Sequence, residues 1–196
     1  MKLFNKWDVE HVKVHDIALQ PYINLSPLLV PRSSGRLGLN RLWGRKIPIV
    51  ERLMNKMMVP GHRGKKHKLT SGKNTGKAVS SYNRVKKVLE IIEQRTKKNP
   101  VEVYIKALEN AAPREEITTI EYGGARYPQA VDMAPQRRID IALRIMVQGS
   151  YQKSYNSKKK TEECLAEEII NAYNMDTKSA AISKKLELER QADASR

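Results

Sequence analysis

Apolar side chains recur at three- and four-residue spacing along most of this chain, and this spacing constrains the fold more than any other feature. Each such run places its apolar side chains on one face of an α-helix, which must be buried against another element. Five runs predict five helices, and a weaker run around Ile182 and Leu186 predicts a sixth within residues 177–196. The positions predicted to face the core are Val50, Leu53, Met54, Met57 and Met58, then Val79, Tyr82, Val85, Leu89 and Ile92, then Ile105, Leu108 and Ala112, then Ile139, Ala142, Leu143 and Met146, and finally Leu165, Ile169, Ala172 and Tyr173.

Proline, glycine and asparagine mark where these helices begin and end. Pro60-Gly61 ends the first helix, and Pro135 begins the fourth. Asn99 can cap the third helix, and Pro100 suits its first position because that position needs no amide donor. The predicted fold class is therefore mainly α, a helical bundle of about six helices.

The helical pattern is interrupted once, in residues 117–133, where polar and apolar side chains alternate. The alternation runs through Ile117, Thr119 and Glu121 to Gly123-Gly124 and resumes at Tyr127. Two glycines supply the positive backbone angles of a tight turn, so we expect a β-hairpin at about residues 116–133. A two-stranded ribbon with so little apolar surface is marginal alone and should project from the helices toward a partner.

Positive charge is concentrated in one part of the chain. Residues 31–98 hold 19 lysines and arginines against three acids, a balance of +16 that equals the formal net charge of the whole chain. Packing like charges together costs self-repulsion, which a bound phosphate backbone relieves. We therefore expect a nucleic acid as the partner. A membrane is not expected, because no apolar face or anchor lies beside the basic cluster.

Two segments lack a helical pattern. Residues 1–30 show no sustained periodicity, and we expect residues 1–44 to form an N-terminal extension that lies on the surface or on a partner. The helical, nucleic-acid-binding domain would then span residues 45–196. Residues 61–77 contain no acid and too few apolar residues to pack on themselves, so we expect them to be ordered only when bound. Their cations are Arg63, Lys65, Lys66, Lys68, Lys73 and Lys77.

Motifs for catalysis or cofactor binding are weak. Residues 72–77 hint at a phosphate-binding loop, but only three residues separate the glycines, and Ala78 follows the lysine where serine or threonine is needed. His11 and His15 could share a helical face, yet no cysteine supports a metal site there. We predict no catalytic residue, no cofactor and no metal.

Acidic pairs and the single cysteine also have ordinary interpretations. Glu162-Glu163 and Glu167-Glu168 fit helix solvation and the dipole at a helix N-terminus better than a catalytic pair. Cys164 allows no intrachain disulfide and should fill core volume, which fits a reducing compartment. The first residues carry acidic and polar groups where a secretory signal needs an apolar region, so we expect a cytoplasmic protein.

Several short motifs occur in an order that resembles one known family. They are Pro48 to Leu53, Asn99-Pro100, Gly123-Gly124, Gln129 to Asp132, Pro135-Gln136-Arg137-Arg138 and the segment from Ala180 to Arg196. Together they resemble ribosomal protein seven of the small subunit, in its archaeal or eukaryotic-like form, over about residues 45–196. The resemblance implies a structural protein that binds the 3′ major domain of small-subunit ribosomal RNA and helps to organise the head. It also implies neighbouring head proteins, and transfer RNA and messenger RNA at the exit site, as partners.

The resemblance also implies which residues meet these partners. The ribbon tip, residues Tyr122, Gly123, Gly124, Arg126 and Tyr127, would lie near the exit-site transfer RNA and messenger RNA. Arg137 and Arg138 are expected to point outward, so that reversing both charges weakens RNA binding without unfolding the protein. Added to the loop cations named above, the residues expected to contact ribosomal RNA are Arg45, Lys46, Arg52, Lys56, Arg137, Arg138, Arg144 and Lys153.

Two other functions stay open at this point. A DNA-binding regulator could also present helices with a basic face, although the cations are spread over a loop and several helices and no dimerisation seam is apparent. No homo-oligomer is expected for the same reason. An RNA-modifying enzyme would need a catalytic cluster, which the sequence does not show.

Overall fold

The computed structural model describes residues 2–38, 41–59 and 74–196, and within them the chain is mainly helical. Six α-helices and one two-stranded antiparallel sheet are present in these ranges, which confirms the predicted fold class. Three short 3-10 segments occur at Gln20–Tyr22, Arg36–Gly38 and Arg41–Lys46. The elements are α1 Ile49–Met58, α2 Ala78–Thr96, α3 Pro100–Ala111, β1 Glu115–Tyr122, β2 Ala125–Asp132, α4 Pro135–Ser154, α5 Thr161–Tyr173 and α6 Ala180–Asp193.

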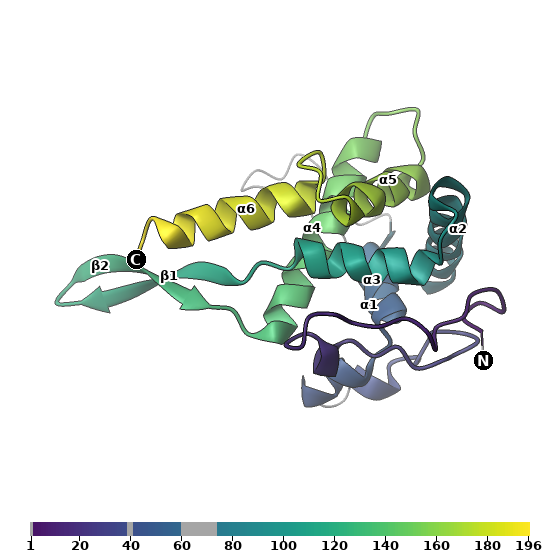
Figure 1. Ribbon diagram of the computed structural model, residues 1–196, viewed down its shortest axis with the longest axis horizontal. Helices are drawn as coiled ribbons and strands as arrows, with labels where there is room; N and C mark the ends of the chain where they lie inside the picture. The colour runs from purple at the N-terminus through teal and green to yellow at the C-terminus, as the bar shows by residue number, and fades with distance from the viewer. Residues whose placement is uncertain (1, 39–40, 60–73) are drawn as a thin grey trace.

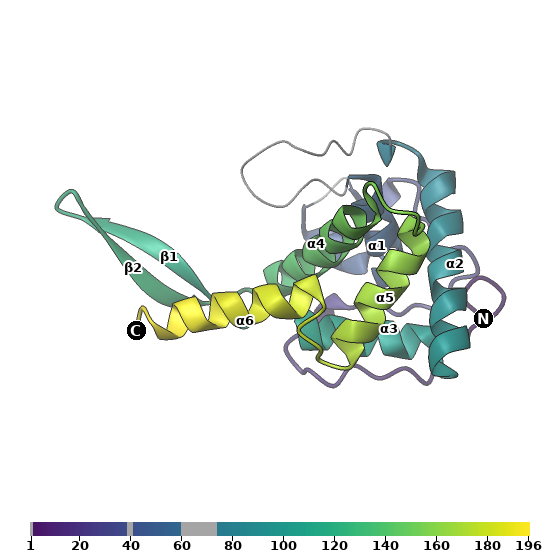
Figure 2. The same cartoon turned by 90° about the horizontal axis from the view of Figure 1, so that it is seen from above.

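Helix α5 lies at the centre of the helical body and packs against α2, α3 and α4 (Figure 2). Leu165 and Ile169 of α5 are fully buried, as are Leu108 of α3, Leu143 of α4 and Leu89 of α2. Burying an aliphatic side chain of this size stabilises the folded state by roughly 1.5–3 kcal/mol. The apolar stripes predicted for these helices therefore form one shared core.

One predicted core position, Val79, is wrong, because its side chain is 64% exposed. The buried face of α2 begins instead at Ser81 and continues through Val85 and Leu89. The Ser81 hydroxyl donates a hydrogen bond to the Met54 carbonyl of α1 at 2.7 Å. Since each helical residue turns by about 100°, Val79 lies on nearly the opposite side of α2 from Ser81.

The N-terminal segment contributes to the core, which the expectation of a surface extension did not include. Leu3, Phe4, Trp7 and Leu19 are buried in the same cluster as the helices. The Phe4 ring packs on Tyr82 of α2, with 4.9 Å between ring centroids. Residues 2–25 therefore complete the helical body. The boundary at residue 44 stays a prediction.

The ribbon extends away from the helical body, with α6 running beside its base (Figure 1). Gly123 and Gly124 have φ values of 58° and 81°, the conformation that the predicted tight turn requires. The C-terminal Arg196 pairs with Glu115 at the start of β1. The base of the ribbon is thus held by α6, while the side chains from residue 118 to residue 129 are exposed.

Candidate nucleic-acid interface

The cations predicted just before α1 lie on the surface in a defined position. Arg45 and Lys46 end the 3-10 segment Arg41–Lys46 and are exposed. The Asn24 side chain donates a hydrogen bond to the Lys46 carbonyl, and the Ile49 amide donates to the Asn24 carbonyl at 3.1 Å. The N-terminal segment therefore fixes the backbone that presents both cations.

Arg52 was predicted to contact RNA, but its side chain is buried inside the protein. Its guanidinium donates to the Tyr22 carbonyl at 3.1 Å and to Asp140 Oδ1, also at 3.1 Å. These bonds join α1, the 3-10 segment Gln20–Tyr22 and α4. Arg52 therefore holds these three elements together and does not belong to the candidate interface.

The prediction that Arg138 points outward is wrong, because this residue is only 7% exposed. Its Nε donates to the Pro113 carbonyl at 3.0 Å, and its Nη2 donates to Asp16 Oδ2 at 2.9 Å. Removing one partner of a buried pair leaves an uncompensated charge and costs about 3–5 kcal/mol. Reversing the charge of Arg138 is thus expected to destabilise the fold, so it is no clean test of RNA binding.

The carboxylate of Asp16 shows how strongly this pair is coupled. Partial burial alone would raise the pKa of Asp16, but the hydrogen bond and the positive charge of Arg138 outweigh it and hold the pKa below its ordinary value. The Ala18 amide adds a further hydrogen bond to the same carboxylate at 2.9 Å. Asp16 therefore stays ionised at neutral pH and fixes the N-terminal segment on α4.

Arg137 and Lys153 reach the surface as predicted, yet both have acidic partners. Arg137 Nε lies 2.7 Å from Glu116 Oε1 of β1, and this hydrogen bond raises the pKa of Arg137. Lys153 Nζ donates to Glu168 Oε2 at 2.7 Å and to the Lys178 carbonyl at 3.1 Å. An RNA phosphate would have to compete with these carboxylates.

The remaining predicted cations fall into two groups. Lys77 and Arg144 are exposed, and Lys56 is partly exposed. The other five, Arg63, Lys65, Lys66, Lys68 and Lys73, lie outside the described residues.

The buried carboxylate of Glu168 was missed, because its place in an acidic run suggested only helix solvation. Its Oε1 accepts hydrogen bonds from the Ser179 hydroxyl at 2.8 Å and from the Ala181 amide at 3.2 Å. The negative charge lies at the N-terminus of α6, where a helix dipole favours an anion. The sequence does contain an indication that Glu168 is buried. It lies three residues after Leu165 and four before Ala172, both core positions, and so shares their face of α5.

The ribbon tip presents aromatic side chains to solvent. Tyr122 is 82% exposed and Tyr127 is 58% exposed. Tyr127 pairs directly with Ile120, and Tyr122 lies two residues farther along β1, so all three side chains share one face of the ribbon. Arg126 lies on the other face, where its Nε is 3.5 Å from Glu121 Oε2. Exposed aromatic rings of this kind can stack on unpaired bases.

The described residues also bear on metal binding, membrane insertion and the single thiol. Among the described residues, no three or more His, Cys, Asp or Glu side chains are grouped so that they could hold a metal ion. No helix in the described ranges has both the length and the apolar character needed to cross a membrane. The single cysteine, Cys164, is buried, and burial raises the pKa of its thiol.

Comparisons with known proteins give a consistent result. The sequence model of the family described as ribosomal protein S7p/S5e matches residues 31–196. The chain is 56% identical over 196 residues to the small ribosomal subunit protein uS7 of Nanoarchaeum equitans, which covers 100% of this chain and 99% of that protein. It is 42% identical over 196 residues to the protein of the same name from Methanothrix thermoacetophila, with 100% of both chains covered. The corresponding protein of Methanosphaera stadtmanae is 46% identical over 191 residues, covering 97% of this chain and 96% of the relative.

Proposed function

Because the chain belongs to the ribosomal protein S7p/S5e family, we propose that it is a structural, non-enzymatic constituent of the small ribosomal subunit in the cytoplasm and binds ribosomal RNA there. Within that role, the protein binds the 3′ major domain of the RNA and helps to assemble the head. The ribbon reaches the exit-site transfer RNA and the messenger exit path. Its further partners are neighbouring proteins of the head.

One observation supports RNA binding most strongly: the protein uses acidic side chains to hold its buried cations and leaves other cations at the surface. Arg52 and Arg138 are neutralised by Asp140 and Asp16 inside the fold. Arg45 and Arg144 stay exposed, in a chain whose formal net charge is +16. Surface cations held by a folded body can neutralise phosphates and release their counterions, while the fold fixes where each charge lies.

The shape of the protein supports recognition of a folded RNA. Double-helical RNA hides its base edges in a deep groove, so proteins read the path of its backbone, its 2′-hydroxyls and its unpaired bases. The helical body suits the backbone, and the ribbon, which holds Tyr122 on β1 and Tyr127 on β2, extends away from that body (Figure 1). A DNA-reading helix would need its cations on one recognition helix, whereas here Arg45 and Arg144 lie on different elements.

A pair of charge-neutralising substitutions tests the proposed surface. We expect Arg45→Gln with Arg144→Gln to weaken binding to a transcript of the 3′ major domain and to reduce the salt slope of the binding constant by about 2, one for each lost phosphate contact. Filter binding across a series of salt concentrations measures both quantities. Thermal unfolding should be unchanged, since both side chains are exposed.

The matched control is Lys184→Gln with Arg190→Gln, which removes the same charge from α6. This control should leave both the affinity and the salt slope close to those of the unmodified protein. Equal losses in the two double variants would contradict the proposed surface, because they would indicate attraction to net charge alone. Equal affinity for duplex DNA of the same length would favour the DNA-binding alternative.

A further inference from the structure

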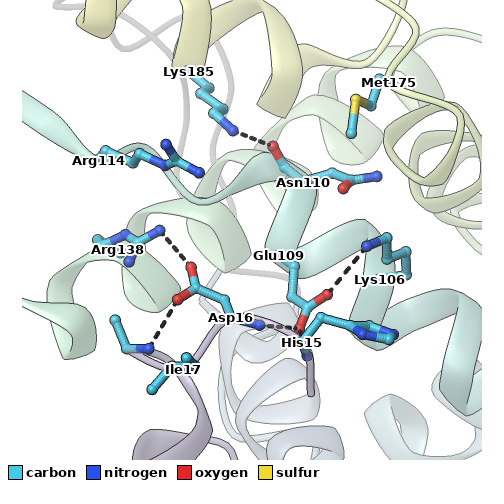
Figure 3. A pocket seen from close by; sticks show the side chains of 11 residues that line it. His15, Asp16, Ile17, Lys106, Glu109, Asn110, Arg114, Arg138, Met175 and Lys185 are labelled. Atoms are coloured by element: carbon cyan, nitrogen blue, oxygen red, sulfur yellow. Dashed lines mark hydrogen bonds and ion pairs between the residues drawn. The ribbon is translucent and has the colours of Figure 1, made fainter. Parts of the chain in front are cut away.

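A cavity of about 600 Å³ lies on the helical body, and the candidate RNA interface does not account for it. It is bounded by residues 15–18 of the N-terminal segment, the last turns of α3, the start of α4, the α5–α6 connection and α6 (Figure 3). Of the residues expected to contact RNA, only the buried Arg138 lines it. The cavity therefore needs an explanation of its own.

The acidic side chains of the cavity are occupied by partners within the protein. Asp16 is paired with Arg138. Glu109 Oε1 accepts hydrogen bonds from the amides of His15 at 2.6 Å and Asp16 at 3.1 Å. Glu109 Oε2 lies 3.7 Å from the ammonium of Lys106. Both carboxylates are therefore engaged in hydrogen bonds or ion pairs within the protein.

Two of those cations, Arg114 and Lys185, are directed into the same part of the cavity (Figure 3). Arg114 is exposed, and its guanidinium has no carboxylate within ion-pair distance in the described part of the chain. Lys185 Nζ donates to the Asn110 carbonyl at 2.9 Å. Burial lowers the pKa of Lys185, and Arg114 and Arg138 lower it further, while Glu189 and Asp16 raise it. Glu189 Oε1 also accepts a hydrogen bond from the Arg114 amide at 3.2 Å, so one carboxylate lies beside these cations. An added carboxylate there would relieve the mutual repulsion of these cations.

Two apolar side chains that line the cavity, Ile17 and Met175, are open to solvent. Ile17 is 83% exposed and Met175 is 63% exposed. Met175 also has a φ of 57°, a conformation that non-glycine residues rarely adopt. These side chains offer a bound peptide apolar surface to pack on, which a phosphate backbone would not use.

We propose that this cavity receives a segment of a neighbouring protein that carries a carboxylate next to an apolar side chain. The carboxylate binds Arg114 and Lys185, and apolar side chains of the same segment pack on Ile17 and on Met175, which lie on opposite sides of the cavity (Figure 3). An RNA backbone fits less well, because it offers no apolar group to pack on Ile17 or Met175. The inference rests on the proposed function in one respect: the neighbouring protein is another protein of the small ribosomal subunit.

Photocrosslinking from the rim tests this proposal in assembled small subunits. Cys164 is 1% exposed, so Ile17→Cys provides a thiol that a benzophenone maleimide can label selectively. We expect crosslinks to a protein segment that contains aspartate or glutamate beside an apolar residue. Arg114→Glu should reduce the yield at least tenfold, whereas Lys158→Glu, the same charge change in the α4–α5 connection, should not.

Each other result has a defined meaning. Crosslinks to RNA alone, no crosslink in a subunit that has incorporated the protein, or an unchanged yield with Arg114→Glu would each overturn the inference while leaving RNA binding intact. Failure of the unlabelled protein with its natural Ile17 to enter the subunit would instead contradict the proposed function.

If Arg114→Glu prevents assembly into the small subunit, a second measurement on the free protein tests the proposal. The free full-length protein is titrated with a short peptide of alternating leucine and glutamate, and the amide resonances of Ile17, Met175 and Lys185 are followed by NMR. We expect these resonances to shift, with at least tenfold weaker binding of a leucine–lysine peptide of equal length. Equal binding of the two peptides would overturn the proposal.

Discussion

At the scale of single residues, the buried charges of this basic protein carry the most structural information. Arg52 and Arg138 each join elements that are far apart in the sequence, through an ion pair and a bond to a backbone carbonyl. Such pairs are costly to form, because both ions lose water, and more costly to break, because one charge stays behind. Arg52 and Arg138 therefore hold the fold together, in contrast to exposed cations such as Arg45 and Arg144.

The pair between Asp16 and Arg138 gives a pH-dependent prediction. We expect Asp16→Asn to lower the free energy of unfolding at pH 7 by about 1–3 kcal/mol. The loss is smaller than for removal of Arg138, because the Asp16 side chain is partly exposed and asparagine keeps an oxygen that accepts from the guanidinium. The folded-state pKa of Asp16 lies below its ordinary value of 3.8. Its stabilisation is therefore fully present above that value and is lost as the pH falls through the folded-state pKa.

Urea unfolding of both proteins between pH 7 and pH 2.5 measures this difference. The difference in free energy of unfolding between the two proteins should stay constant down to about pH 4 and then decrease toward zero. The surface substitution Asp193→Asn serves as the control and should change stability by no more than about 0.5 kcal/mol. A gap that widens in acid would show that Asp16 is not held in its ionised form by Arg138.

Sequence alone predicted how many cations this chain carries but not which of them are buried. Arg137 and Arg138 are neighbours, and only their angle around α4 separates them. Arg138 lies four residues before the core position Ala142, so helical spacing could have placed it toward the core. Its partner Asp16 is 122 residues away, and no local sequence pattern predicts an ion pair between residues so far apart in the chain.

At the scale of elements, the helices and the ribbon were predictable because each is encoded by a local period. The N-terminal segment was not, because it follows no helical or alternating pattern and buries single residues such as Phe4 and Trp7 in gaps between helices. Trp7 also donates a hydrogen bond from Nε1 to Glu93 Oε2 of α2 at 3.0 Å. Contacts of this kind depend on the tertiary arrangement and leave no periodic signal.

The close approach of α4 and the start of α6 gives a prediction about packing. A Cβ at Gly149 would lie 2.7 Å from the Ala180 Cβ, too close for two carbon atoms. We expect Gly149→Ala to destabilise the protein by about 1–3 kcal/mol through overpacking. This loss would appear although alanine favours a helix over glycine by about 1 kcal/mol.

Gly44→Ala is the matched control, since the nearest atom to its Cβ would be Gln136 Nε2 at 3.9 Å, an ordinary contact. Thermal unfolding of the two variants should therefore separate clearly. If Gly149→Ala were as stable as the unmodified protein, α4 and α6 would not pack as closely as the structure shows.

At the scale of the whole molecule, the proposed RNA-binding surface combines a helical body, a projecting ribbon and a localised positive charge. Arg45 and Arg144 lie on elements of the body, and Tyr122 and Tyr127 lie on the strands of the ribbon. The ribbon extends away from the body (Figure 2). The fold was predictable from periodicity, and the class of partner from charge. The nucleotides that the protein meets were not, because they depend on a surface that belongs to the RNA.

Nucleotide-resolution crosslinking in intact small subunits tests the proposed ribosomal role most directly. Photoreactive groups are placed at Arg45 and Arg144 on the body and at Tyr127 on the ribbon. We expect the two body positions to crosslink to the 3′ major domain of small-subunit ribosomal RNA and the ribbon position to crosslink to exit-site transfer RNA or messenger RNA. Crosslinks from the body to a different domain of the RNA, or to none, would contradict the proposed role.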